Sequence, residues 1–214
     1  MRGLRRFLVD PAEARVERCE LCATPVPSEH PHLVQVAERR IRCACGPCAL
    51  LFDHHSLFDT PGAGGGGYRR VPDRYRADPA FHLDDAQWDA LQIPVGMVFF
   101  LRNSAQPTED GQPRVIACYP SPAGATESEL SLDAWTDGVG ATALAGELEP
   151  DVEALLVRRE PTECLLVPID ACYRLVGLVR LRWRGFDGGG DARTAIEDFF
   201  HDVRSRARTL ENRS

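Results

Sequence analysis

The sequence predicts an α+β protein in which a small cysteine-rich module precedes an antiparallel sheet covered by helices on one side. Three observations support this fold class. Two Cys-x-x-Cys pairs lie near the N-terminus, a glycine-rich stretch follows them, and strand and helix signals alternate from Asp78 onward. The chain accordingly divides into a cysteine-rich module at 1–59, a glycine- and arginine-rich linker at 60–77 and an α+β domain at 78–214.

The composition limits the classes of partner. The 214 residues carry a formal net charge of −7, and all 25 basic residues are arginine. An acidic chain has little non-specific affinity for nucleic acid or for anionic membranes. No stretch approaches the roughly 18 apolar residues of a membrane span. We therefore expect no nucleic-acid partner, no membrane partner and a cytoplasmic location, where thiols stay reduced.

Within the module, the sequence predicts a short helix followed by a hairpin. The helix spans 11–18. Residues 32–37 (HLVQVA) alternate as a strand, and 41–45 form the returning strand. After Cys48, residues 49–53 begin a second helix.

In the first half of the domain, the sequence predicts a helix and a second hairpin. The helix spans 84–92, with Asp84 or Asp85 as its cap and with Trp88 and Leu91 on one face. Buried strands joined by a polar turn are expected at 94–101 and 114–119, with a further turn at 120–124.

In the second half of the domain, the sequence predicts a mixture of helices and strands. Residues 132–148 fit neither pattern clearly, and 151–158 are expected to be helical. Strands are expected at 164–169 and 173–183, the second with Leu181 and Trp183 opposite a row of arginines. A long helix capped by Asp191 follows, and its apolar residues at helical spacing are Ile196, Phe199, Phe200, Val203, Ala207 and Leu210.

The two Cys-x-x-Cys pairs predict a metal site. Cys19 and Cys22 form the first pair, and Cys45 and Cys48 form the second. Each pair presents two sulfurs from one tight turn, so four thiolates can surround one tetrahedral ion. Two such turns separated by a hairpin, the second opening a helix, are typical of zinc-ribbon and treble-clef modules. We predict structural Zn²⁺, since zinc binding contributes about 10–16 kcal/mol in finger peptides and a module this small has little core of its own.

Three alternatives remain open at this site. Cys43 lies just before Cys45 and could replace it as the third ligand. Rubredoxin-like iron is less favoured than zinc, because rubredoxin knuckles usually place glycine after the second cysteine, where Ala23 and Ala49 stand. The thioredoxin-like sequence Cys-Gly-Pro-Cys suggests a redox dithiol at Cys45 and Cys48. The presence of the other pair favours a metal.

The histidines near the module are expected to be solvated or locally hydrogen-bonded. No carboxylate–histidine spacing supports a second metal ion among them. These residues are His30, His32, His54 and His55.

Two further groups of residues are expected to be structural. Aromatic and basic residues alternate at 68–70 and 74–76, as in single-stranded nucleic-acid binders. The acidic net charge favours instead a solvated linker or a docking strip for an acidic protein. Cysteines in apolar strands are expected to lie in the core, and these are Cys118, Cys164 and Cys172.

Six segments together resemble an uncharacterised bacterial family that is encoded beside uptake nickel–iron hydrogenase genes. They span most of the chain and lie at 18–22 (RCELC), 43–52 (CACGPCALLF), 100–104 (FLRNS), 119–130 (YPSPAGATESEL), 168–173 (PIDACY) and 183–188 (WRGFDG). The resemblance implies an accessory protein for making, stabilising or connecting a hydrogenase. It also implies a cysteine-rich N-terminal module that includes Cys43. The family has no established activity, so the resemblance implies no catalytic residues.

We therefore predict a non-enzymatic, zinc-stabilised accessory protein whose partner is a protein, such as a hydrogenase subunit or maturation factor. The alternative is a small redox protein that transfers electrons through rubredoxin-like iron or through the Cys45/Cys48 dithiol. A third hypothesis is an enzyme with a pocket within 78–214. The chain lacks the phosphate-loop, serine-hydrolase and zinc-peptidase motifs that would support it.

Overall fold

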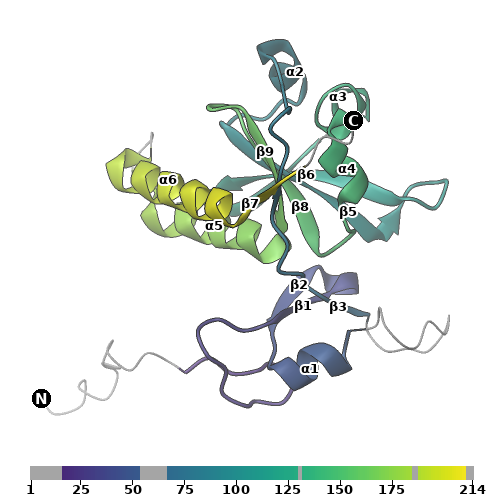
Figure 1. Ribbon diagram of the computed structural model, residues 1–214, viewed down its shortest axis with the longest axis vertical. Coiled ribbons are helices and arrows are strands. Elements are labelled where there is room, and N and C mark those ends of the chain that lie inside the picture. The colour runs from purple at the N-terminus through teal and green to yellow at the C-terminus, as the bar shows by residue number, and fades with distance from the viewer. Residues whose placement is uncertain (1–15, 54–66, 130–131, 185–187, 211–214) are drawn as a thin grey trace, which may run out of the picture.

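The computed structural model describes residues 16–53, 67–129, 132–184 and 188–210. A three-stranded sheet and helix α1 form the N-terminal module, and a seven-stranded sheet with helices on both faces forms the rest (Figure 1). The fold is α+β, as predicted. Most of the predicted helix at 11–18 lies outside the described residues. Within the described ranges, no helix combines the length and apolar character that crossing a membrane requires.

The N-terminal sheet is built on the predicted hairpin. Strand β1 (His32–Gln35) pairs antiparallel with β2 (Arg40–Cys43), and the 3-10 turn η2 (Val36–Glu38) precedes the bend. Arg39 closes the bend with a φ of 51°. Strand β3 (Tyr68–Arg70) pairs with the other edge of β1. A segment predicted as linker thus supplies a strand.

The larger sheet has the strand order β10-β4-β9-β8-β5-β6-β7, antiparallel except between β10 and β4. The predicted hairpin corresponds to β5 and β6, whereas β7 was not predicted. The strands are β4 (Arg76–Ala77), β5 (Met97–Pro107), β6 (Pro113–Ser121), β7 (Gly124–Ser128), β8 (Glu153–Arg158), β9 (Glu163–Pro168) and β10 (Arg208–Thr209).

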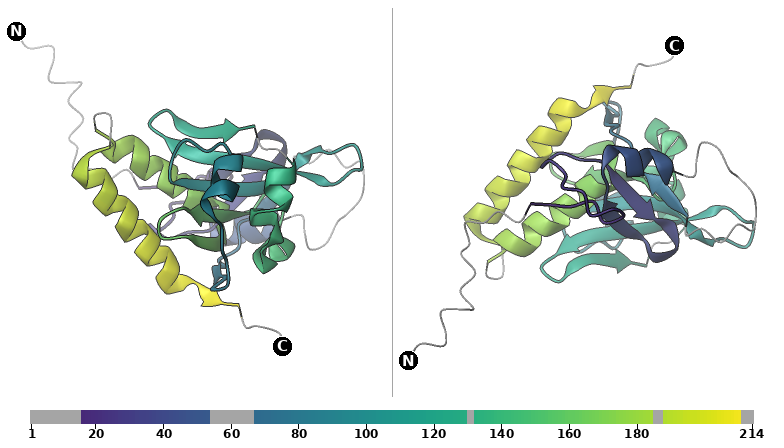
Figure 2. Two further views of the ribbon diagram at one scale, coloured as in Figure 1. Left: turned by 90° about the horizontal axis from the view of Figure 1, so that it is seen from above. Right: turned by 90° about the horizontal axis from the view of Figure 1, so that it is seen from below.

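Helices cover both faces of this sheet, not the single face predicted. Phe99 and Leu101 of β5 pack in the cluster that contains α5 and α6, whereas Val98 and Phe100 pack in the opposite cluster. Strands that are apolar on both faces need two covering layers. On one face, α5 (Ile169–Arg182) and α6 (Gly189–Arg206) lie side by side (Figure 2). The other face carries α2 (Asp85–Ala90), α3 (Leu132–Thr136), η3 (Val139–Ala141) and α4 (Ala143–Glu147).

Two of the predicted helices are confirmed. Asp84 caps α2 through a capping box with Gln87, and Trp88 and Leu91 are buried in one cluster. Helix α6 buries Ile196, Phe199, Phe200 and Val203 as predicted, but its N-cap is Gly188 and not Asp191. It ends at Arg206, so Ala207 and Leu210 lie beyond the helix, and Leu210 packs in the cluster on the opposite face of the sheet.

The prediction of a helix at 151–158 was wrong, because this segment contains strand β8. Ala154, Leu155 and Leu156 favour a helix in isolation, but all three are fully buried in a strand that pairs with β5 and β9. Burial in the centre of a sheet overrides a modest helix propensity.

The prediction of a strand at 173–183 was also wrong, because this segment lies in α5. Leu175, Val176 and Val179 are buried at helical spacing against the sheet. Leu181 is 71% exposed. The alternation that suggested a strand is confined to the last turn of the helix and the residues after it.

The module packs directly on the larger sheet. Val34 of β1 is buried in the same cluster as Leu101 of β5 and Ile169 of α5. Val71 and Tyr75, which follow β3, are buried in this cluster as well. The connection between the two sheets is therefore part of the core, and it holds the module against the beginning of α5.

Candidate metal centre

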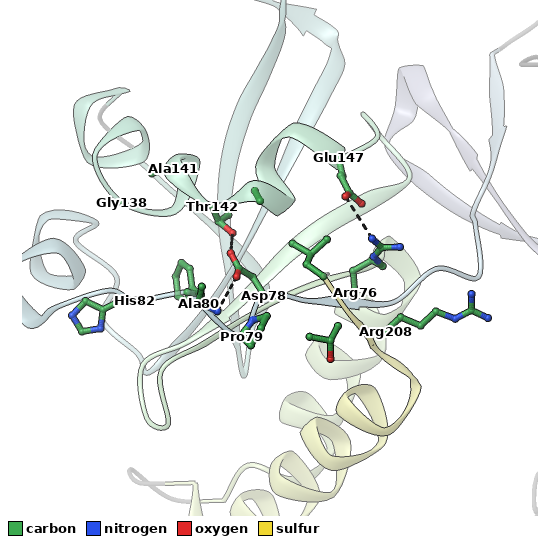
Figure 3. A pocket seen from close by; sticks show the side chains of 14 residues that line it. Arg76, Asp78, Pro79, Ala80, His82, Gly138, Ala141, Thr142, Glu147 and Arg208 are labelled. Carbon is green, nitrogen blue, oxygen red and sulfur yellow. Dashed lines mark hydrogen bonds and ion pairs between the residues drawn. The ribbon is translucent and has the colours of Figure 1, made fainter. Parts of the chain in front are cut away.

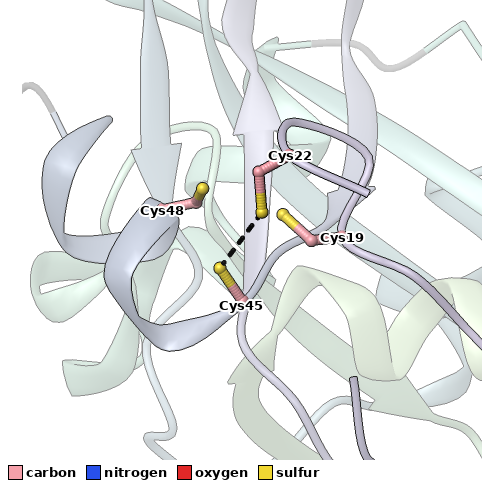
Figure 4. A group of neighbouring side chains, drawn as sticks. All are labelled: Cys19, Cys22, Cys45 and Cys48. Carbon is pink, nitrogen blue, oxygen red and sulfur yellow. Dashed lines mark hydrogen bonds between the residues drawn. The ribbon is translucent and has the colours of Figure 1, made fainter. Parts of the chain in front are cut away.

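Four thiols converge in the N-terminal module. The Sγ atoms of Cys19, Cys22, Cys45 and Cys48 lie within 4.8 Å of one another, and those of Cys22 and Cys45 are 3.6 Å apart (Figure 4). Four sulfurs bound at about 2.3 Å to one tetrahedral ion lie roughly 3.8 Å apart. All eight cysteines belong to the described residues, and all are free thiols. The donor set and its spacing fit a metal ion held in a zinc-ribbon-like module.

The first pair lies in a tight turn. The N–H of Ala23 donates to the carbonyl oxygen of Cys19 at 2.8 Å, and the N–H of Cys19 donates to that of Thr24 at 2.8 Å. Ala23 has a φ of 60°, in the left-handed region that favours glycine. The turn thus has the backbone conformation of a glycine-containing knuckle, so alanine at this position does not argue against iron.

The second pair opens a helix. Cys45 is the N-cap residue of α1 (Gly46–Leu51), Pro47 lies in the first turn, and Cys48 follows as a buried residue. The helix begins at Gly46, earlier than predicted. A helical turn therefore presents Cys45 and Cys48 together towards the first pair.

Glu20 fixes the two pairs relative to each other. Its N–H donates to the carbonyl oxygen of Cys43 at 2.9 Å, and its carboxylate accepts from the N–H of Cys43 at 2.9 Å and from Arg42 at 3.0 Å. Burial acts to raise the pKa of Glu20, but the Cys43 N–H and Arg42 outweigh it and lower the pKa. The first turn is thereby held beside the end of β2, from which the chain enters the second pair.

A small core supports the centre. It contains two of the cysteines and a few apolar side chains from the surrounding strands and turns. Its buried members are Cys19, Val26, Leu33, Ala44, Cys48 and Ala49.

The thiols differ in acidity. Hydrogen bonds from Thr24 lower the pKa of Cys22 to about 6, whereas burial raises the pKa of Cys48 to about 12. At Cys19, burial acts to raise the pKa, but backbone N–H groups, first among them that of Cys45, lower it overall. A bound cation favours the thiolate at every ligand. Such an ion would therefore convert this mixed set into four anionic donors.

Cys43 is not part of the four-thiol group. Its Sγ lies within 4.8 Å of a ring nitrogen of His30 and of His32. The group of four contains Cys45, the residue preferred from the sequence. His54 and His55 lie outside the described residues.

The basic segment at 68–76 is neither a solvated linker nor an open docking strip. Arg74 donates to both oxygens of the fully buried Glu153 carboxylate, at 2.8 and 2.6 Å. Arg206 stacks over the buried ring of Tyr75, and Arg69 donates to the carbonyl oxygen of Pro150. The expectation was wrong because the guanidinium groups of Arg69 and Arg74 bind acceptors at residues 147–153, which are distant in the sequence.

A cavity of about 1050 Å³ lies on the larger domain (Figure 3). Asp78 accepts hydrogen bonds from Thr142 Oγ1 at 2.5 Å and from the N–H of Ala80 at 2.9 Å. His82 lines the same cavity but points away from Asp78 (Figure 3). Two of the marked contacts, Thr142 with Asp78 and Arg76 with Glu147, fasten β4 and the segment after it to α4, and the third lies within that segment.

The three remaining cysteines are core residues, as expected. Cys118, Cys164 and Cys172 are each at most 2% exposed. Burial raises the pKa of Cys118 to about 12 and raises those of Cys164 and Cys172 as well. Buried thiols held in the neutral form are poor nucleophiles.

Comparison with protein families gives a match over most of the chain. A model of DUF5947, described as a family of unknown function, matches residues 18–207. The matched segment includes the four-thiol cluster, α5 and α6 and nearly all of both sheets. No curated protein and no solved structure matches the chain. Because the match covers most of the chain, this protein belongs to the DUF5947 family, a family of unknown function.

Proposed function

We propose that the protein is a non-enzymatic accessory protein of the cytoplasm, stabilised by structural Zn²⁺ at Cys19, Cys22, Cys45 and Cys48. The observation that carries the proposal is the closed four-thiol cluster. Four sulfurs fill the coordination shell of a tetrahedral ion and leave no position for water or substrate. A turn that faces the beginning of a helix is also typical of treble-clef modules. An ion in this setting holds a fold together.

The proposed partner is a protein of an uptake nickel–iron hydrogenase system, either a subunit or a maturation factor. The support is the resemblance of the six segments described above. A contact surface is available beside the cysteines, since Leu50 and Leu51 of α1 are 67% and 76% exposed. Adjacent exposed leucines are favourable for burial against another protein.

Affinity purification of the full chain from its native host tests this proposal. We expect a hydrogenase subunit or maturation factor to co-purify with the wild type and with Leu181→Ser, a control at an exposed leucine of α5. The double variant Leu50→Ser, Leu51→Ser should lose most of this partner. Repeated purification without any hydrogenase-system protein would refute the proposed partner. Equal recovery of the partner with the wild type and the double variant would refute only the proposed contact surface at Leu50 and Leu51.

A redox role is the second candidate, and Cys22 favours it. Its thiol is exposed, its pKa is lowered to about 6, and its Sγ lies 3.6 Å from that of Cys45. The φ of 60° at Ala23 is compatible with an iron-binding knuckle, so the turn does not exclude iron. Metal analysis and a visible spectrum of the purified protein separate the two roles. Zinc in a colourless solution supports the accessory role, whereas a red protein with iron charge-transfer bands supports electron transfer.

A further inference from the structure

We propose that His30, His32 and Cys43 form a second metal site that binds a divalent cation of borderline softness, such as Zn²⁺, through three protein ligands. One ring nitrogen of each histidine and the Sγ of Cys43 all lie within 4.8 Å of one another. His32 begins β1 and Cys43 ends β2, and the two are directly paired across the antiparallel ladder. The hairpin therefore fixes two of the three donors side by side.

The hydrogen bonds of the histidines leave the nitrogen Nε2 of each ring free to bind. His30 Nδ1 lies 2.7 Å from the carbonyl oxygen of Pro27, and His32 Nδ1 lies 2.8 Å from a carboxylate oxygen of Asp170. Both partners are acceptors, so each Nδ1 carries the proton and each Nε2 of a neutral ring keeps its lone pair. A histidine that binds a metal through one ring nitrogen commonly donates the N–H of the other to such an acceptor, and this bond fixes the orientation of the ring.

His30 supplies an independent observation that points to a ligand. Its side chain is only 4% exposed, and its Nε2 is buried with no hydrogen-bond partner. Native proteins rarely leave a buried polar atom without a partner. A cation shared with His32 and Cys43 would satisfy it.

The donor set defines the kind of ion and its coordination. Two imidazole nitrogens and one thiolate suit zinc and neighbouring transition metals, not calcium or magnesium. His30 and His32 line a groove of about 790 Å³ together with Tyr75, Asp170 and Arg174, whereas Cys43 does not. Three protein ligands would leave the fourth position of a tetrahedral ion for water or a small ligand. Sites with three protein ligands and an open position differ from closed structural sites.

Metal titration tests the second site without reference to any partner. The full chain carrying one equivalent of Zn²⁺ is titrated with Co²⁺, and bound cobalt is followed by its visible and thiolate-to-cobalt absorption. We expect one further equivalent per chain, with charge transfer from a single sulfur. His32→Gln and Cys43→Ser should each abolish this equivalent and keep the first. His201→Gln, at an exposed histidine of α6, should keep both.

Asp170→Asn provides a variant that alters no ligand. Because the carboxylate orients His32, we expect the second equivalent to bind about 10–100-fold more weakly while the first is unchanged. Circular dichroism and the retained first equivalent show that each variant is folded. If excess Co²⁺ yields no second equivalent in the wild type, or if His32→Gln and Cys43→Ser both retain it, the site does not exist.

Discussion

At the scale of single residues, Ala23 shapes the first turn of the metal centre. An alanine with a φ of 60° carries steric strain that glycine does not, on the order of 1 kcal/mol. Ala49, which follows the second pair, lies instead inside α1 and is 1% exposed. The same substitution should therefore have opposite effects at these two equivalent positions.

We predict that Ala23→Gly tightens metal binding and Ala49→Gly weakens it. Relief of strain at Ala23 should improve zinc retention by up to about fivefold, the equivalent of about 1 kcal/mol. Glycine at position 49 adds flexibility to a helix and removes a buried methyl, so retention should fall by a similar or larger factor. Competition with a chelator measures both changes. Weaker zinc retention in Ala23→Gly than in the wild type would show that the turn is unstrained.

The residues of the four-thiol cluster were predictable from sequence, whereas those of the second group were not. Two Cys-x-x-Cys pairs are local patterns, and the chemistry of tetrahedral sites joins them. His32 and Asp170 are 138 residues apart, and only the packing of α5 against the module brings them together. The three-residue group includes Cys43, which the local pattern relates to Cys45 and not to the two histidines.

At the scale of elements, the local sequence pattern predicted the hairpins and α6. It predicted a helix where β8 lies and a strand where most of α5 lies. Both elements are apolar, and in short apolar segments the helical and extended patterns overlap. Their place in the fold decides between them: β8 pairs with strands on both sides, whereas α5 packs on one face of the sheet. Helix α5 also contains Gly177, which is partly exposed and has space around it for a Cβ atom.

Gly177→Ala should stabilise the protein, because glycine within a helix costs about 0.5–1 kcal/mol relative to alanine. The control is Gly111→Ala, the same change at a residue with a φ of 78°, where alanine is strained and should destabilise. Urea unfolding of both variants measures the two effects. No gain from Gly177→Ala would contradict the helical assignment of this segment.

At the scale of the whole molecule, residues 67–77 join the two sheets into one body. β3 belongs to the smaller sheet and β4 to the larger; between them Val71 and Tyr75 are buried, and Asp73 and Arg74 are ion-paired. The bidentate pair of Arg74 with the fully buried Glu153 is the strongest polar contact along this path. The sequence could not reveal it, since the partners are 79 residues apart.

Arg74→Ala should destabilise the protein by about 2–3 kcal/mol. The loss is smaller than the roughly 3–5 kcal/mol of a fully buried pair, because one third of the Arg74 side chain is exposed. The matched control is Arg159→Ala, which breaks exposed pairs with Asp85 and Asp89 and should have much less effect. Equilibrium unfolding in urea compares the variants. Equal losses would mean that the connection does not depend on the buried pair.

The four-thiol metal centre is tested most directly by X-ray absorption at the zinc edge, on protein carrying one equivalent of zinc. A tetrathiolate site predicts a single shell of four sulfurs at about 2.3 Å. In Cys48→Ser, the shell should fall to three sulfurs or the zinc should be lost. A nitrogen or oxygen shell in the wild type, or an unchanged sulfur shell in Cys48→Ser, would contradict a metal centre formed by these four thiolates.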